Sequence, residues 1–202
     1  MTYDLEAATQ HLAEADPTMA QLIAHVGPCR LEQRPFNEPF AALLRAIVFQ
    51  QISTASASTI HGRVRALFMD DTPTPSALLA LDEETLRGAG LSRPKQRAAR
   101  SLAERVLDGT VPPANDIVAL SDAELISRLT EVRGIGPWTV QMLLIFNLGR
   151  PDVLPTTDLG VQRGAMNAYA LDALPSPTSL AALGEPWQPF RSVASWYLWR
   201  AA

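Results

Sequence analysis

The sequence predicts an all-α protein built from two helical subdomains. Apolar residues recur at helical spacing along the 202-residue chain, which is 47% hydrophobic, and no segment has the pattern of a convincing strand. Capping residues and Gly or Pro stops separate these periodic segments. The length is enough for one sizeable core or for two small subdomains that share an interface.

In the first half of the chain, the periodic segments predict helices over residues 5–15, 39–50, 54–68 and 82–89. The first helix is expected to stop at Asp16-Pro17, because proline ends a preceding helix. The second segment, PFAALLRAIVFQ, is apolar almost all round, which is typical of a buried central helix. Gly90 ends the short helix that precedes it.

In the second half, helices are expected over residues 92–107, 121–130 and 137–148, from residue 158 onward, and from residue 189 to the C-terminus. Asp108-Gly109 closes the first of these. Ser121 and Glu124 have the spacing of a capping box, in which each side chain bonds the other residue's backbone amide. The Pro-rich stretches 73–75 and 175–177 are expected to be loops.

Two subdomains are expected. One is residues 36–150, which include a hairpin of two helices and their connecting turn over about residues 122–148, and the other is residues 1–35 together with 151–202. We expect a cleft between them.

The net charge of −4 argues against broad, nonspecific adhesion to nucleic acid or to an anionic membrane, but not against a local basic face. A single cysteine, Cys29, excludes a disulfide framework, a cysteine-ligated zinc site and a four-cysteine iron–sulfur cluster. No apolar run approaches the roughly 20 residues of a membrane span, and the N-terminus lacks a signal-peptide core. We therefore expect a soluble cytoplasmic protein.

The stretch EVRGIGPWTV places Gly134 and Gly136 in a short turn between two expected helices. Glycine takes conformations with positive φ and allows close approach of another backbone. Free amides at the start of the next helix favour an anion such as a DNA phosphate. An ordinary helix–helix turn with a glycine cap is the alternative.

This stretch resembles a helix-hairpin-helix motif, and VLPTTDLGVQRG follows it at the distance seen in DNA glycosylases of that superfamily. The segments AIVFQQISTASAS, GLSRPKQRAARSLAE and WQPFRSVASWYLWR extend the resemblance from about Phe40 to the end of the chain. Together they are similar to the bacterial 3-methyladenine DNA glycosylase II family. Thr157 departs from the family pattern, in which many members carry a second acidic residue. The separate β-rich N-terminal domain of longer members is not expected, because only about 35 residues precede the match.

The resemblance implies that Asp158 is the catalytic carboxylate. Cleavage of a base from deoxyribose builds positive charge on the sugar, which a carboxylate stabilises while it orients or deprotonates water. Asp158 also fits a plain helix N-cap, and the two roles are compatible.

The same resemblance places Trp138, Met142 and Trp199 in the pocket for the extruded base. Bifunctional members of the superfamily carry a lysine nucleophile at the position of Trp138, so a monofunctional enzyme that uses water is implied. An aromatic face attracts a cationic alkylated purine. Met142 stands where the family often has tyrosine. A plain core position is the alternative for Trp199.

Contacts with DNA are implied as well. Gln51, with Ile52 beside it, would fill the gap left by the flipped nucleotide, unless Gln51 is only a buried polar residue at a helix end. Phosphate contacts are expected from the hairpin and from the basic helix, at Arg133, Gly134, Ile135, Gly136, Thr139, Arg93, Lys95 and Arg97. A basic run of this kind also occurs as a solvated face.

The sequence thus predicts a DNA glycosylase that removes alkylated bases from damaged duplex DNA as a monomer and leaves an abasic site. No cofactor is expected; a monovalent cation on hairpin carbonyls near Arg133 and Ile135 is typical of the family. A glycosylase for uracil or mismatched adenine, a noncatalytic DNA-binding module and a helical interaction protein are the alternatives.

Overall fold

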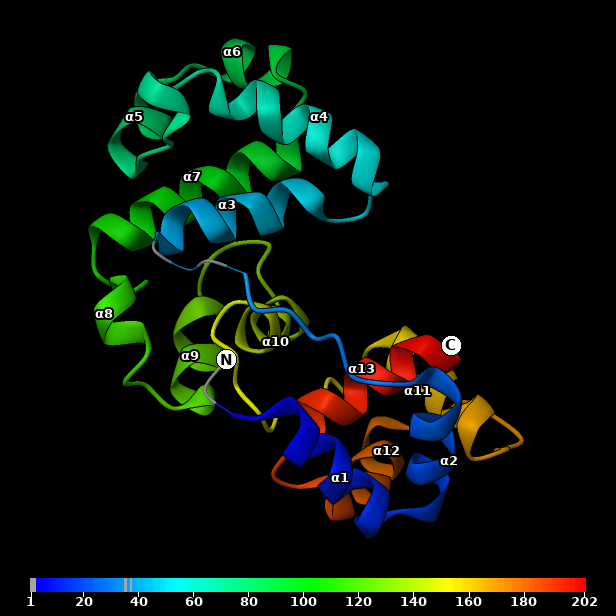
Figure 1. Ribbon diagram of the computed structural model, residues 1–202. Coiled ribbons are helices and arrows are strands. Elements are labelled where there is room, and N and C mark those ends of the chain that lie inside the picture. The colour runs from blue at the N-terminus through cyan, green and yellow to red at the C-terminus, as the bar shows by residue number, and fades with distance from the viewer. Residues whose placement is uncertain (1–2, 35, 37) are drawn as a thin grey trace. The chain divides into compact units, whose positions relative to one another are not determined.

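The computed structural model describes residues 3–34, 36 and 38–202, and every regular element in these ranges is a helix (Figure 1). The expected all-α class is confirmed. Contacts divide the chain into unit 1, Met1–Pro35 with Gln141–Ala202, and unit 2, Phe36–Val140. The division falls at Val140 rather than at residue 150, and Pro35, at the other expected boundary, lies outside the described residues. Among the described helices, none combines the length and apolarity needed to cross a membrane.

Unit 2 is organised around one long amphipathic helix, α7, which packs against α3, α5 and α6. Its buried face consists mainly of small side chains and Leu102, whereas Leu43 and Ile47 contribute from α3. Fully burying a leucine or isoleucine contributes about 1.5–3 kcal/mol. The helices are α3 Pro39–Phe49, α4 Thr54–Arg65, α5 Pro75–Ala80, α6 Glu83–Gly88, α7 Arg93–Leu107, α8 Ala114–Ile117, α9 Asp122–Leu129 and the start of α10 Pro137–Phe146, with a 3-10 turn at Met69–Asp71.

Unit 1 is built around the C-terminal helix α13, which contacts α1, α2 and α11. Trp187 and Tyr197 are fully buried in its core with Leu12 and Met19. The helices are α1 Leu5–Ala15, α2 Pro17–Val26, the end of α10, α11 Leu159–Ala168, α12 Pro177–Leu183 and α13 Arg191–Ala201, with a 3-10 turn at Glu185–Trp187.

A buried carboxylate, Asp16, ties three parts of unit 1 together. One oxygen caps α2 by accepting the amides of Thr18 and Met19 at 2.9 and 3.1 Å. The other accepts the Trp187 indole N–H at 2.9 Å and the Tyr169 hydroxyl at 2.5 Å. Burial alone would raise the pKa of Asp16, but these hydrogen bonds hold it below its ordinary value. The α1–α2 corner is thereby joined to segments more than 150 residues away.

Four described α-helices are absent from the sequence-based expectation: the single turn α8, and α2, α5 and α12, which share one cause. Helices α2, α5 and α12 each begin with a proline, Pro17, Pro75 or Pro177, that was interpreted as a stop or a loop. Proline is favoured in the first turn, where its missing N–H would have no partner and its φ already suits a helix. The preceding Asp16, Thr74 and Ser176 supply the cap. Each proline is a start signal here, and α4 ends at Arg65 rather than at Phe68.

Helices α11 and α13 approach each other closely where α11 presents glycine. A Cβ built on Gly164 would lie 1.9 Å from the carbonyl oxygen of Leu198 on α13. One turn earlier, a Cβ on Gly160 would lie 2.9 Å from Cδ1 of Trp199. Residues four apart share a helix face. The two glycines therefore form the surface against which α13 rests.

We predict that Gly164→Ala lowers the free energy of unfolding by about 3 kcal/mol or more, because the new methyl group must displace backbone rather than a flexible side chain. Gly62→Ala is the matched control. No atom outside its own helix lies within 4 Å of a Cβ there, so the better helix propensity of alanine should raise stability by about 1 kcal/mol. Denaturant unfolding followed by circular dichroism measures both, and equal effects would contradict the close packing of α11 and α13.

Candidate active site

Asp158 is held at the N-terminus of α11 by two donors. Its backbone is extended, at φ −74° and ψ 120°, and its Oδ1 accepts the amide of Val161 at 2.8 Å. The same oxygen accepts the indole N–H of Trp199 at 2.8 Å. The expected N-cap is therefore present, and a side chain from α13 adds a second restraint. The half-buried carboxylate has a fixed orientation.

A turn before α11 sets the position of this aspartate. The Asp158 amide donates to the carbonyl of Pro155 at 2.9 Å, and the Gln162 side chain donates to the carbonyl of Thr156 at 2.9 Å. Pro155 is buried, whereas Thr157 is exposed. The segment PTTD thus forms a braced turn that presents Asp158 at the first turn of the helix.

Trp199 is part of an aromatic stack in unit 1. Its ring lies 5.6 Å from that of Phe146 with an interplanar angle of 24°, and the Arg34 guanidinium carbon lies 5.2 Å from the Phe146 ring centre. The Arg34 amide also donates to the Phe146 carbonyl at 2.7 Å. Trp199 is only partly buried, so it is not a plain core residue. Phe146 and Arg34 belong to no recognisable motif, so the sequence did not predict their place beside Trp199.

The other two expected pocket residues lie on α10. Trp138 is 44% exposed, which is unusual for a tryptophan, and Met142 is half-buried. Trp138 belongs to unit 2, whereas Met142 belongs to unit 1 with Asp158 and Trp199. A common pocket for all four residues stays a prediction.

The hairpin is anchored by two apolar side chains, Val132 and Ile135, which are 0% and 4% exposed. Gly134 has φ +80°, and a Cβ there would lie 3.2 Å from that of Ala98 on α7, so a glycine is needed for both reasons. A Cβ on Gly136 would meet nothing within 4 Å, and its φ is not positive. The open surface at Gly136 leaves room for another backbone.

Two expected DNA contacts of this region have buried side chains. Ile135 and Thr139 are 4% and 8% exposed, so any contact of these residues with a phosphate would come from the main chain. Arg133 is exposed, and its amide donates to the Ser101 hydroxyl on α7 at 3.1 Å. The hairpin therefore offers its main chain and the Arg133 side chain.

The hairpin carbonyls fit the cation that the family resemblance implies. Those of Val132, Gly134 and Gly136 accept hydrogen bonds from Ile135, Gln50 and Val140. The carbonyl oxygens of Arg133 and Ile135 accept none from the described part of the chain. Carbonyl oxygens are ligands that hard cations prefer.

Most basic side chains in the run on α7 form hydrogen bonds or an ion pair with other groups of the protein. Lys95 donates to the carbonyl of Val48 at 2.6 Å, and burial lowers the pKa of its ammonium group. Arg100 donates to the carbonyls of Leu79 and Leu81 at the end of α5, and Arg105 pairs with Asp108 at 3.0 Å.

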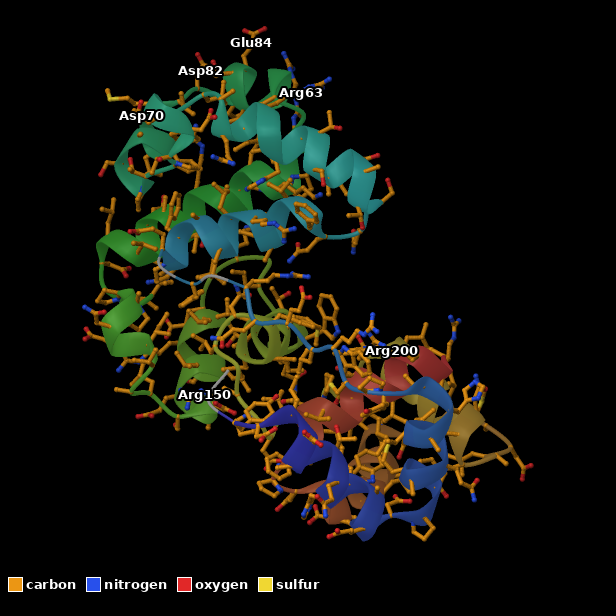
Figure 2. All side chains as sticks on the ribbon, viewed as in Figure 1. Arg63, Asp70, Asp82, Glu84, Arg150 and Arg200 are labelled. Atoms are coloured by element: carbon orange, nitrogen blue, oxygen red, sulfur yellow. The ribbon has the colours of Figure 1, made fainter. Side chains whose placement is uncertain are left out.

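Only Arg93 and Arg97 of this run are exposed without such a partner among the described residues. A continuous phosphate-facing strip stays a prediction, and of its expected members Lys95 already has a partner inside the protein. On α13, the Arg200 guanidinium is likewise engaged, 3.2 Å from the ring centre of Trp196 (Figure 2).

The turn between α3 and α4 carries the expected intercalating residues. Gln51 is exposed, and Ile52 is 38% exposed, which is uncommon for isoleucine. Gln51 has φ +58°, a left-handed conformation that side chains with a Cβ rarely adopt. Gln51 is therefore not a buried polar residue at a helix end, which was the alternative.

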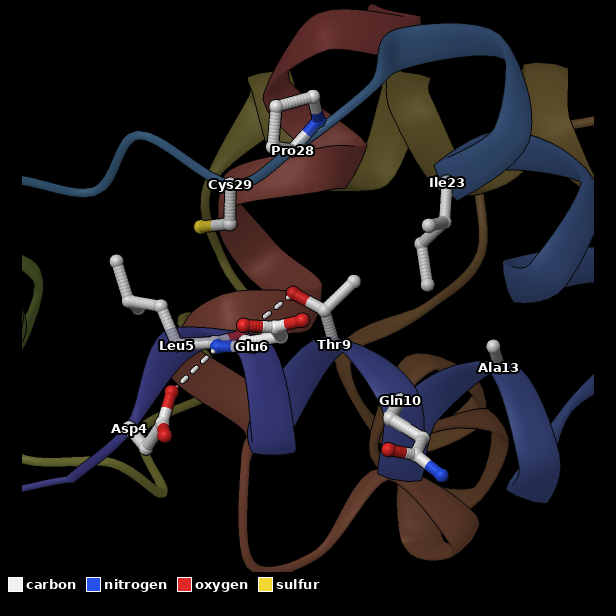
Figure 3. Close-up of a pocket in the computed structure, with 9 residues that line it drawn as sticks. All are labelled: Asp4, Leu5, Glu6, Thr9, Gln10, Ala13, Ile23, Pro28 and Cys29. Atoms are coloured by element: carbon white, nitrogen blue, oxygen red, sulfur yellow. Dashed lines mark hydrogen bonds between the residues drawn. The ribbon is translucent and has the colours of Figure 1, made fainter.

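A separate hollow of about 760 Å³ in unit 1 lies between α1 and the segment that follows α2 (Figure 3). Its lining includes Asp4, Glu6 and Cys29, whose thiol pKa is raised by burial, and no lysine or arginine. Asp158 does not line it. Its acidic rim does not suit a phosphate.

Comparison with known proteins assigns the chain to a family. Residues 44–189 match the HhH-GPD superfamily of base excision DNA repair proteins. The chain belongs to this superfamily. It is 36% identical over 202 residues to DNA-3-methyladenine glycosylase 1 of Schizosaccharomyces pombe, covering 98% of this chain and 88% of that protein. It is 32% identical over 199 residues to the alkylbase DNA glycosidase-like protein mag2 of the same yeast, covering 98% and 93%.

A solved structure agrees with this HhH-GPD assignment. The S. pombe 3-methyladenine DNA glycosylase in complex with abasic DNA superposes with a TM-score of 0.84 at 36% identity, covering 96% of this chain and 95% of that one. The expected resemblance to the 3-methyladenine DNA glycosylases is confirmed.

In this HhH-GPD protein, Lys95 has a hydrogen-bond partner inside the protein, whereas Arg97 is exposed, so replacing them should affect the free energy of unfolding differently. We expect Lys95→Met to lower the free energy of unfolding by about 1.5 kcal/mol, since a hydrogen bond from a charged donor to the end of α3 is lost. Arg97→Met, which keeps a similar stem on the exposed face, should change it by no more than about 0.5 kcal/mol. Urea unfolding of the two variants measures both changes. A Lys95→Met variant as stable as wild type would mean that the hydrogen bond to Val48 does not stabilise the fold.

Proposed function

We propose that the protein is a monofunctional DNA glycosylase that hydrolyses the N-glycosidic bond of alkylated bases, of the 3-methyladenine and 7-methylguanine type, in duplex DNA. The observation that carries this proposal is the carboxylate of Asp158, held by the Val161 amide and the Trp199 indole in a chain of the HhH-GPD superfamily. Base release would be a step of base excision repair and would leave an abasic site.

The chemistry needs one oriented carboxylate. As the bond between the sugar C1′ and the base nitrogen breaks, its electron pair leaves with the base, and positive charge develops on the sugar. A fixed Asp158 carboxylate stabilises that charge and orients a water molecule. Water oxygen then bonds to C1′, and its proton passes to Asp158 or to solvent. An N-alkylated purine already carries a positive charge, so it departs as a neutral base.

Trp138, in the first turn of α10, favours water as the nucleophile. Trp138 has no amine and cannot form a Schiff base with the sugar. The exposed ring of Trp138 and the partly buried ring of Trp199 suit a flat cationic base, an attraction of about 0.5–2 kcal/mol. Selectivity would then come from the weak bond, from easy unstacking and from stacking in the pocket, which includes Met142.

DNA would be held by a small set of groups in unit 2. The main chain of Gly134 and Gly136 and the cations Arg93, Arg97 and Arg133 would contact phosphates, and Gln51 with Ile52 would enter the duplex. The carbonyls of Arg133 and Ile135 would hold a monovalent cation, which would add positive charge beside a phosphate. The cytoplasmic location and monomeric state expected from the sequence are part of this proposal.

We expect Asp158→Asn to slow single-turnover base release from methylated duplex DNA by about 100-fold or more, because the carboxylate charge is lost at the reacting sugar. Affinity for abasic DNA should change little. Asparagine is a good N-cap, so the fold should survive.

Asp82→Asn is the matched control. Asp82 caps α6 through the Thr85 amide at 2.7 Å, in the way that Asp158 caps α11, but on a helix that contributes nothing to the proposed site. This variant should release bases at the wild-type rate. If both variants are equally active, Asp158 is only a helix cap and the proposed mechanism is wrong.

A further inference from the structure

The turn that carries Gln51 and Ile52 is short and conformationally unfavourable. Helix α3 ends at Phe49, Gln50 is its extended C-cap, and Ser53 already caps α4 through the amide of Ser56. Gln51, between them, takes the left-handed φ of +58° without being glycine. A turn of this kind relaxes to other conformations unless neighbouring groups restrain it.

One side chain supplies that restraint from the hairpin. The Gln50 amide nitrogen Nε2 donates to the carbonyl oxygen of Gly134 at 2.9 Å, across 84 residues of sequence. Gly134 itself is fixed by its φ of +80° and by its closeness to Ala98. The preceding turn of α3 is held by Lys95, which donates to the carbonyl of Val48. Among the described residues, this hydrogen bond joins the exposed tip to the hairpin.

We propose that Gln50 is a positioning residue for base extrusion, an inference that rests on the proposed function. Its hydrogen bond makes the intercalating turn and the phosphate-contacting hairpin parts of one rigid piece within unit 2. When the hairpin holds a phosphate, Gln51 and Ile52 then reach the base stack at a set distance from it. Gln50 touches neither the base nor the sugar and acts through the turn that follows it.

This role predicts a dependence on base pairing. Extrusion of a paired, stacked base is costly, whereas a base with no partner is extruded easily. Gln50→Leu keeps the size of the side chain and removes its donor. It should slow single-turnover release of a methylated base about tenfold when the base is paired, and less than about twofold when it lies opposite an abasic site, so the two effects should differ by about fivefold or more, which is about 1 kcal/mol.

The experiment compares wild type, Gln50→Leu and Gln50→Glu on both duplexes, with Gln10→Leu as a control of the same chemical change on the exposed face of α1. Gln50→Glu replaces the donor by a carboxylate that repels the Gly134 carbonyl, and it should behave like Gln50→Leu. Thermal unfolding checks that each variant is folded. Equal slowing on the two duplexes, or no slowing on either, would overturn the proposal.

A second measurement needs no catalysis. A 2-aminopurine placed beside an abasic-site analogue becomes more fluorescent when the turn enters the stack. Wild type should raise this fluorescence, and Gln50→Leu should raise it by less than half as much at saturating protein. If wild type releases no base, the proposed function fails while this signal still tests Gln50; an equal rise for both proteins would overturn the positioning role.

Discussion

The site depends above all on the close approach of α11 and α13. Gly160 and Gly164 remove the side chains that would keep the helices apart, and the backbone of α13 at Leu198 occupies the space of a missing Cβ. Only at this separation does the next residue, Trp199, reach Asp158 with its indole N–H. A methyl group at Gly160 would lie 3.1 Å from Oδ1 of the same carboxylate. The contact between α11 and α13 therefore both packs the two helices and orients Asp158. Two glycines within a helix lower its intrinsic stability, and this contact offsets that loss.

A second constraint concerns where the positive charges are used. In a chain with a net charge of −4, several cations that face helix ends or acidic partners stabilise the fold rather than a ligand. Lys95 and Arg100 bond the last carbonyls of α3 and α5, which have no partner within their own helices. On α7, a DNA partner would then meet only two free cations among the described residues, Arg93 and Arg97, beside the main-chain groups of the hairpin. Such contacts position a duplex without reading its sequence, which suits an enzyme that finds damage by its chemistry.

Local signals carried most of the fold prediction. The capping box at Ser121 and the cap at Asp158 are confirmed, because a cap is decided by a few neighbouring residues. The helices that begin at Pro17, Pro75 and Pro177 were missed, since proline ends one helix and starts another with the same chemistry.

Contacts between residues far apart in the sequence could not be predicted from local signals. The bond from Trp199 to Asp158 spans 41 residues, and that from Gln50 to Gly134 spans 84. Neither leaves a local pattern, and the same is true of Lys95, whose internal partner is 47 residues away. Family resemblance located Asp158, whereas the structure shows what holds it.

The most direct measurement of the central claim is to incubate the wild-type protein with methylated duplex DNA and identify the released bases by mass spectrometry. The account predicts free 3-methyladenine and 7-methylguanine, with one abasic site formed in an unbroken strand for each base released; DNA that is bound without any base release would contradict it.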